Sequence, residues 1–381
     1  MSEPARFIGS EIYRGSSYGR KHPLAIPRVS TCMDLCGALG WLPPEVYIDS
    51  PRAEPPALAR FHDPAYIAAV QTAEAEQRVS ACVRARFGLG ANGNPIFPAV
   101  FRRPATACGG SLAAADRLMA GARVIYNPAG GTHHGRPAQA SGFCYFNDPA
   151  LAILRLLDRG CARVLYVDLD AHHGDGVQDA FHGDARVLTV SVHEDGRWPM
   201  AGADPGDRPI PGGSRDRAGG SARNVPVPPG FNDAEMAYVI EAAVLPLADA
   251  FEPEVVVVQG GCDALAEDPL SRLSLSNLAL WRAVGAVAAV APRLLCLGGG
   301  GYNPWAVARA WAGVWATLRD AAIPDRLPPE AEAVLRALTW RHSWGRSPPA
   351  AWWTRLADAP REGPIRREVR TAVARAMAET W

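Results

Sequence analysis

Two aspartates and a histidine near the middle of the chain have the types and spacing of metal ligands. Residues 166–176 begin with apolar positions typical of a buried strand and continue into aspartates and histidines. Asp170 and His172 are two residues apart, so on an extended segment both project to one side and can reach one ion. Burying such groups is costly unless a partner compensates, as a divalent cation does. A salt-bridged helix start would explain only Asp175.

The elements that must position these ligands follow an alternating pattern. Short β-branched runs alternate with helical patterns, which predicts a parallel sheet with helices on both faces. Strands are expected at residues 123–126, 163–167, 186–192, 254–259 and 293–297. Helices are expected around residues 111–120, 149–159, 233–250, 277–290, 305–318 and 365–379. The Gly- and Pro-rich residues 201–222 are expected to form an irregular surface excursion.

Four of the predicted strands lead into residues that can do chemistry. The first leads to His133 and His134, the second to the aspartates described above, the fourth to Asp263, and the fifth to four glycines and Tyr302. In open α/β sheets the ligand crevice lies outside the carboxyl ends of the strands, so these groups are expected to share one cleft. The glycines permit sharp turns and a close approach of backbone to a substrate.

Composition restricts the class of protein. The chain has 381 residues with 48% hydrophobic content, enough for one large α/β core. Its formal net charge is zero and it has no basic stripe, so neither nucleic acid nor a membrane surface is expected as a partner. The N-terminus lacks the profile of an export signal and no apolar run could span a bilayer, which predicts a cytoplasmic location.

These motifs, in this order, resemble the histone deacetylase family of the arginase-like superfamily, in its class I-like and bacterial acetoin-utilisation branches. The resemblance runs from about Tyr18 to Trp315 and is densest in residues 130–148, 164–181, 259–269 and 297–303. It implies one deacetylase domain over residues 1–381, with the arginase-deacetylase fold: a mostly parallel eight-stranded sheet with helices on both faces. The Trp-rich residues 340–381 would pack on the body or on a partner subunit, which leaves a homo-oligomer open.

The resemblance assigns Asp170, His172 and Asp263 as zinc ligands, with one or two open positions for water and the substrate carbonyl. Three protein ligands and an open position are typical of a catalytic zinc. Two carboxylates among three ligands also suit iron(II), so both metals remain candidates. The family's potassium ions are implied as well. The inner ion would be held by Asp168, Asp170, His172, Ser191 and Val192, and an outer one would sit around Phe181, Asp184 and Val187.

The resemblance also assigns the catalytic groups. His133 and His134 would flank the attacking water, one accepting its proton and the other supporting the transition state or protonating the leaving amine. Asp168 and Asp175 match the carboxylates behind the two imidazoles. Tyr302 would donate a hydrogen bond to the carbonyl oxygen as it becomes an oxyanion. The implied activity removes an acetyl or related acyl group from the side-chain amine of lysine in proteins or peptides.

Five further positions are expected to contact the substrate. Gly142 and Phe143 match the wall of the family's substrate channel, and Trp198 takes the place of the opposing aromatic residue. Leu270 stands where acetylpolyamine-selective relatives carry an acidic residue, which favours acyl-lysine. Asn92 lies near the position of a rim aspartate that grips the substrate backbone, and an amide lacks that charge. A small acylated amine or a polyamine therefore stays open as an alternative substrate.

Two other classes of function fit the sequence less well. A ureohydrolase of the same superfamily would need an Asp-x-Asp-x-x-Asp-Pro block on the strand that here leads to Asp263, and the sequence lacks it. A catalytically silent acyl-lysine-binding scaffold would be expected to lose Tyr302 or one of the histidines, and all are present.

Overall fold

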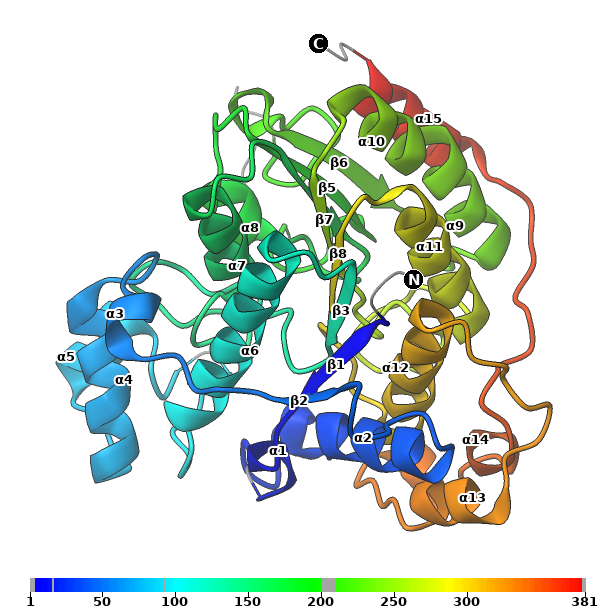
Figure 1. The fold of residues 1–381 in the computed structure, drawn as a ribbon, viewed down its shortest axis with the longest axis horizontal. Helices are drawn as coiled ribbons and strands as arrows, with labels where there is room; N and C mark the ends of the chain where they lie inside the picture. The colour runs from blue at the N-terminus through cyan, green and yellow to red at the C-terminus, as the bar shows by residue number, and fades with distance from the viewer. Residues whose placement is uncertain (1–3, 16, 92, 201–209, 379–381) are drawn as a thin grey trace.

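A single parallel sheet forms the centre of the computed structural model, which describes residues 4–15, 17–91, 93–200 and 210–378. In this part of the chain the sheet has eight strands in the order β2-β1-β3-β8-β7-β4-β5-β6, and all pairs are parallel (Figure 1). The strands are β1 (Arg6–Gly9), β2 (Tyr47–Asp49), β3 (Val124–Asn127), β4 (Val164–Asp168), β5 (Val187–Glu194), β6 (Ala222–Val227), β7 (Val255–Gln259) and β8 (Leu294–Leu297).

The five strands expected from apolar runs are all present, and they include the five central and consecutive members of the sheet. β4 and β7 are buried along their whole length, so their sequences are continuously apolar rather than alternating. Three strands were not predicted from the sequence. β1 and β2 are only four and three residues long. β6 contains Arg223, Asn224 and Pro226, and a proline is compatible with it because β6 lies at the sheet edge.

Helices cover both faces of the sheet, which confirms the predicted fold class (Figure 1). One face carries α6 (Arg102–Met119), α7 (Asp148–Asp158) and α8 (Asp175–Ala180). The other face carries α2 (Arg28–Ala38), α9 (Asp233–Val239), α10 (Leu245–Phe251), α11 (Asn277–Val290) and α12 (Pro304–Leu318). The remaining N-terminal helices are α1 (Ile12–Gly15), α3 (Pro55–Leu58), α4 (Pro64–Glu76) and α5 (Ala81–Phe87). Within the described ranges, no helix is both long and apolar enough to cross a membrane.

Two helices differ from their predicted bounds for local reasons. α6 begins at Arg102, nine residues before the predicted start, because Pro104 and two adjacent glycines mask its helical pattern. A Cβ at Gly109 would overlap the carbonyl of Pro51, so a close backbone crossing requires glycine there. The predicted helix 233–250 consists of α9, a π-helical turn and α10 in direct succession.

The C-terminal segment packs on the body. It comprises α13 (Pro329–Arg336), α14 (Ala351–Thr354) and α15 (Arg367–Met377). The ring of Trp352 is buried with its centroid 5.5 Å from that of Trp305 on α12. Asp358 accepts a hydrogen bond from Arg309, whose side chain is 1% exposed. Trp344 is 44% exposed and Trp381 lies outside the described residues, so a role for these two at a subunit contact stays a prediction.

The contact between α11 and α12 yields a stability prediction. A Cβ at Gly313 would overlap the indole of Trp281, which cannot turn away freely because its Nε1 donates to the Ala310 carbonyl at 2.8 Å. Gly313→Ala is expected to lower the free energy of unfolding by about 1–3 kcal/mol, measured by urea unfolding. Gly285→Ala on α11 is the matched control, because its Cβ would meet only the methyl group of Thr317 at 3.2 Å. Equal stability of the two variants would contradict the packing argument.

Candidate active site

Four neighbouring strands bring the chemically active side chains to one edge of the sheet. β3, β8, β7 and β4 are adjacent, and each is followed by one of the segments singled out by sequence. The loop after β3 carries His133 and His134, and the loop after β8 carries Tyr302. The segments after β7 and β4 carry Asp263 and Asp170, respectively. Groups that are far apart along the chain therefore meet because parallel strands end at a common edge.

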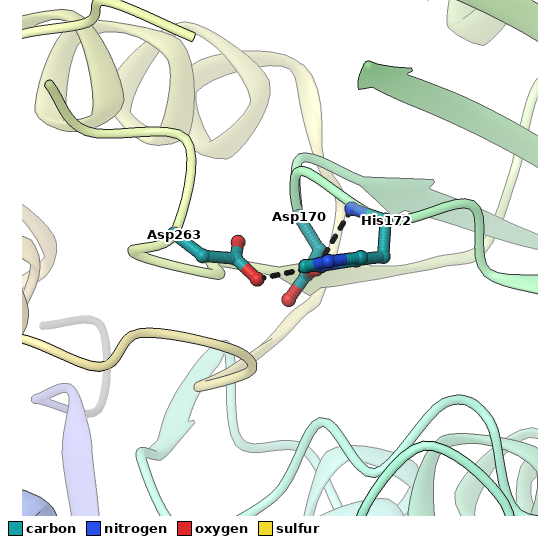
Figure 2. Close-up of side chains that lie close together, drawn as sticks. All are labelled: Asp170, His172 and Asp263. Carbon is teal, nitrogen blue, oxygen red and sulfur yellow. Dashed lines mark hydrogen bonds and ion pairs between the residues drawn. The ribbon is translucent and has the colours of Figure 1, made fainter. Parts of the chain in front are cut away.

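Asp170, His172 and Asp263 converge on one point (Figure 2). One ligand atom from each lies within 4.8 Å of the others, and all three residues are buried. His172 Nδ1 lies 2.8 Å from Asp263 Oδ2 and 3.2 Å from Asp170 Oδ1. This arrangement of one imidazole and two carboxylates fits a divalent cation such as zinc or iron(II).

The electrostatics of this trio favour a positive charge. Burial lowers the pKa of His172, but the neighbouring Asp263 and Asp170 outweigh it and raise that pKa to about 10. A protonated imidazole balances one of the two carboxylates, and a metal ion would replace that proton. Backbone N–H groups hold the carboxylates in place: Gly300 donates to Asp170 at 2.6 Å and Ala171 donates to Asp263 at 2.9 Å.

Two glycines are required by this close packing. A Cβ at Gly300 would overlap Oδ2 of Asp263, and a Cβ at Gly261 would overlap Oδ2 of Asp170. The glycine-rich turns after β7 and β8 therefore do more than provide a bend. They let backbone pass directly against the two carboxylates.

His133 and His134 each hydrogen-bond a carboxylate through Nδ1. His133 Nδ1 lies 2.7 Å from Asp168 Oδ2, and His134 Nδ1 lies 2.7 Å from Asp175 Oδ1. The two ring centroids are 3.8 Å apart, and both side chains are buried. With Nδ1 engaged, Nε2 of each ring is the atom available to a substrate or a water.

The two imidazoles have opposite pKa shifts. Burial lowers the pKa of His133, yet Asp168 and Asp170 raise it to about 9. Burial, together with the neighbouring His133, lowers the pKa of His134 to about 4. Asp175 would be raised by burial, but His134 and Arg136 bring its pKa down to about 2. Near neutral pH, His134 is therefore a neutral base beside a cationic partner.

Several supporting residues were not assigned a role from the sequence. The Asn147 side chain donates to the carbonyls of His133 at 3.2 Å and of Gly135 at 2.9 Å, which fixes the loop that carries both histidines. His62 Nε2 accepts from the Asn147 backbone at 2.9 Å. Asp148 accepts from the Thr132 backbone at 2.8 Å. Asn147 and Asp148 lie in residues 130–148, where the resemblance to the family is dense, but only the tertiary structure relates them to the histidines.

Other unassigned groups orient the carboxylates. The Tyr166 hydroxyl donates to Asp168 at 2.8 Å and lies 3.1 Å from Gln259 Oε1. Arg136 donates to Asp175 at 2.5 Å and also to Asp179. No spacing rule in the sequence signals these contacts, because the partners come from different elements.

A cavity of about 680 Å³ leads to this cluster. Tyr302, Gly142, Phe143, Trp198 and Leu270 all line it, together with His134 and His172. The ring of Trp198 lies 4.6 Å from that of His134, and its side chain is 43% exposed, as expected for a residue at a channel mouth. Gly142 has φ +53°, and a Cβ there would overlap both rings.

The remaining expected contacts are placed as follows. Asn92 lies outside the described residues. Asn94 lines the cavity instead, and within the described part of the chain its buried amide has no hydrogen-bond partner. Ser191 is in register with Asp168 on the adjacent strand, and its hydroxyl lies 2.8 Å from His193 Nδ1. Val192 is buried on the same strand. The potassium sites stay a prediction.

Comparison with known proteins identifies the family. Residues 22–318 match the model of the histone deacetylase domain. The chain is 32% identical to the acetoin utilization protein AcuC of Bacillus subtilis (strain 168) over 97% of this chain and 96% of that protein. It is 34% identical to the putative histone deacetylase 2 of Caenorhabditis elegans, over 82% of this chain and 61% of that protein. A crystal structure of a histone deacetylase homologue from Aquifex aeolicus is similar with a TM-score of 0.91 and 34% identity, covering 99% of this chain and 100% of that chain.

The chain therefore belongs to the histone deacetylase family, which confirms the resemblance drawn from its motifs. Membership supports a hydrolase that removes acetyl groups. It also supports dependence on a metal, for which Asp170, His172 and Asp263 form a buried candidate cluster.

The carboxylate pair predicts metal retention. Asp263→Asn replaces a charged ligand with a neutral one, so bound metal is expected to fall from about one ion per chain toward zero, with affinity lowered roughly 100-fold or more. Metal content of the purified protein, measured by mass spectrometry, gives the readout. Asp249→Asn, an exposed aspartate on α10, is the control and should keep its metal. Equal metal content in both variants would rule out Asp263 as a ligand.

Burial of His62 predicts a pH dependence of stability. Burial lowers the pKa of this imidazole from 6.5 to about 4. Between these values the unfolded chain binds a proton that the folded protein does not, so the free energy of unfolding falls as the pH drops from about 6.5 toward 4. From pH 7 to pH 5, this one group is expected to remove about 2 kcal/mol.

Urea unfolding of His62→Gln at these two pH values tests this expectation. The variant should lose about 2 kcal/mol less than the unaltered chain over the same interval. His182→Gln, at an exposed position, should retain the full pH dependence. An unchanged pH dependence in His62→Gln would contradict the assignment.

Proposed function

We propose that this chain is a zinc-dependent amidohydrolase that removes an acetyl or related acyl group from the side-chain amine of lysine in proteins or peptides. The observation that carries the proposal is the juxtaposition of two carboxylate-bound histidines with the Asp170, His172 and Asp263 cluster at the inner end of one cavity. A divalent cation held by that cluster would supply Lewis acidity to the substrate carbonyl and to the attacking water.

The histidines handle the proton in this proposal. Neutral His134 accepts a proton from the attacking water through Nε2, because Asp175 occupies its Nδ1. His133, kept cationic by Asp168, stabilises the negative charge that develops on the substrate. The proton taken by His134 is then given to the leaving amine as the amide C–N bond breaks. The products are a carboxylic acid and a free lysine-type amine.

Tyr302 is the proposed donor to the carbonyl oxygen. Its side chain is 7% exposed, and burial raises the pKa of its phenol well above the usual value, so it remains a hydrogen-bond donor throughout the physiological range. Its backbone N–H donates to Asp268 at 2.6 Å, which fixes the turn that presents the ring. A donor aimed at the developing oxyanion lowers the barrier more than it stabilises the substrate.

The substrate cavity supports a neutral acyl-lysine stem. Gly142, Phe143, Trp198 and Leu270 offer an apolar passage, and no carboxylate is among the described residues that line it. A polyamine carries further cations that such a passage does not attract. A deacylase of small, uncharged acylated amines is the second candidate, because the described residues that line the cavity include no carboxylate in place of the family's rim aspartate. The intact set of His133, His134 and Tyr302 argues against a silent scaffold.

Turnover of a fluorogenic acetyl-lysine peptide tests the proposal. Tyr302→Phe and His134→Ala are each expected to lower turnover roughly 100-fold or more, because each removes a group that acts in the transition state. Both variants should keep the metal content of the unaltered chain. Tyr238→Phe, a partly buried tyrosine on α9, is the control. Full activity of Tyr302→Phe would refute the role of its hydroxyl, and a parallel panel of free acylated amines distinguishes the two substrate classes.

A further inference from the structure

A second cavity lies directly beside the mouth of the substrate cavity. Its volume is about 710 Å³, and Leu270 and Tyr302 line both cavities, so the two share a wall. One side of the second cavity comes from residues 17–26 and the opposite side from residues 339–342. We call this second cavity the basic groove, for the charges described next.

Three full positive charges line the basic groove. They belong to Arg20, Lys21 and Arg341, all with exposed side chains, and Lys21 is the only lysine of the chain. Over the described ranges, none of the three takes part in an ion pair, and no aspartate or glutamate lines the groove. The groove therefore presents positive charge that the protein itself does not neutralise.

The other charged groups around the mouth are accounted for differently. Arg197 and Arg272 line the substrate cavity, but both pair with the buried Glu194, at 3.5 and 2.6 Å. His22 lies in the groove and is neutral near pH 7, because burial lowers the pKa of its imidazole. Glu194 balances only one of these two arginines, so the substrate cavity keeps one net positive charge where the groove has three.

Aromatic contacts hold both sides of the groove in place. The rings of Trp340 and His342 are stacked with centroids 4.5 Å apart, and Trp340 packs against Trp305 of α12 at 6.5 Å. On the other side, Tyr18 stacks on His22 at 5.0 Å. The side that carries Arg341 lies beyond residues 22–318, the part that matches the family model. The groove is therefore completed by a segment outside the matched deacetylase domain.

We infer that the basic groove binds a carboxylate-bearing stretch of the substrate peptide while the acyl-lysine occupies the substrate cavity. This inference rests on the proposed lysine deacylase function. An extended peptide advances about 3.3 Å per residue, so side chains two or three residues from the acyl-lysine reach roughly 7–10 Å from it, across the shared wall at Leu270. Carboxylates of the peptide pair with the exposed cations of the groove and displace only solvent. The positive charge of the groove therefore favours acidic peptides and accelerates their association with the protein.

Matched peptides test this inference. One acetyl-lysine peptide carries glutamates two and three residues to either side, and its partner carries glutamines at those positions. The ratio of kcat/KM for the two peptides is expected to be about fivefold in favour of glutamate at low salt, and to approach one at 0.5 M salt. In the double variant Lys21→Gln, Arg341→Gln the ratio should fall below about twofold. The charge reversal Lys21→Glu should lower it further.

The control removes two positive charges elsewhere. Arg117→Gln with Arg282→Gln changes exposed residues of α6 and α11 that line neither cavity, so it should leave both the activity and the fivefold ratio unchanged. Thermal unfolding of every variant verifies folding, and Lys21→Gln alone carries the test if the double variant does not fold. Equal kcat/KM for both peptides in the unaltered chain, or the same loss of preference in the control, would overturn the inference.

Two further measurements separate the alternatives. Absence of turnover on every peptide would contradict the proposed function. The peptide-binding role of the groove would then be tested by fluorescence anisotropy of the labelled peptides, and the glutamate peptide is expected to bind about fivefold more tightly than the glutamine peptide. Inorganic phosphate at millimolar concentration serves as a free anion. Three results together would make the groove an effector site and the inference wrong. Phosphate would change the turnover of the glutamine peptide, Lys21→Gln would abolish that change, and the unaltered chain would show no preference for the glutamate peptide.

Discussion

Two carboxylates held side by side in a buried site, with one imidazole between them, set the main physical constraint on this molecule. Asp170 and Asp263 cannot both remain ionised in the interior without a positive charge next to them. The raised pKa of His172 is the response of the protein alone to that requirement. A divalent cation answers the same requirement and leaves the imidazole neutral as a ligand. The free energy of folding of the protein therefore depends on which positive charge, a proton or a metal ion, lies between these carboxylates.

The surroundings of the cluster follow from holding these charges at close range. Glycines at positions 261 and 300 exist because backbone must pass against the carboxylates without a Cβ between. The same crowding sets the pKa values of the tandem histidines apart, since two adjacent imidazoles are not both positively charged at neutral pH. A difference in environment thus gives two chemically identical side chains different pKa values, and the hydrogen bonds through Asn147 and His62 fix the loop that carries both rings.

Charges at the mouth of the cavity are not subject to the same constraint, because the mouth is open to solvent. There, the two arginines that line the cavity share the single carboxylate of Glu194, whereas the three cations of the basic groove have no carboxylate partner among the described residues. Exposed charges contribute little to stability, and their effect is felt mainly by a partner that arrives from solution. The interior cluster is suited to the chemical step and the groove to the choice of substrate. The two meet at Leu270 and Tyr302.

The order of motifs along the chain determined the fold class and the position of the candidate site. Apolar runs located the central strands because those strands are buried on both faces, and polar residues at their ends indicated one shared cleft. Strands β1, β2 and β6 were missed because short or half-polar segments carry no such signal. The start of α6 was misplaced because its glycines serve a crossing with residues 50–53, which local propensity does not encode.

Only the tertiary structure decided which side chains support the candidate site and how charge is distributed around it. Asn147, His62, Tyr166 and Arg136 contribute through contacts between elements that are distant along the chain. Lys21 and Arg341 are separated by most of the sequence and face one groove because the C-terminal segment folds back onto α12. Sequence patterns report periodic burial and local turns. Pairings of this kind depend on how whole elements pack, and packing is a property of the complete fold.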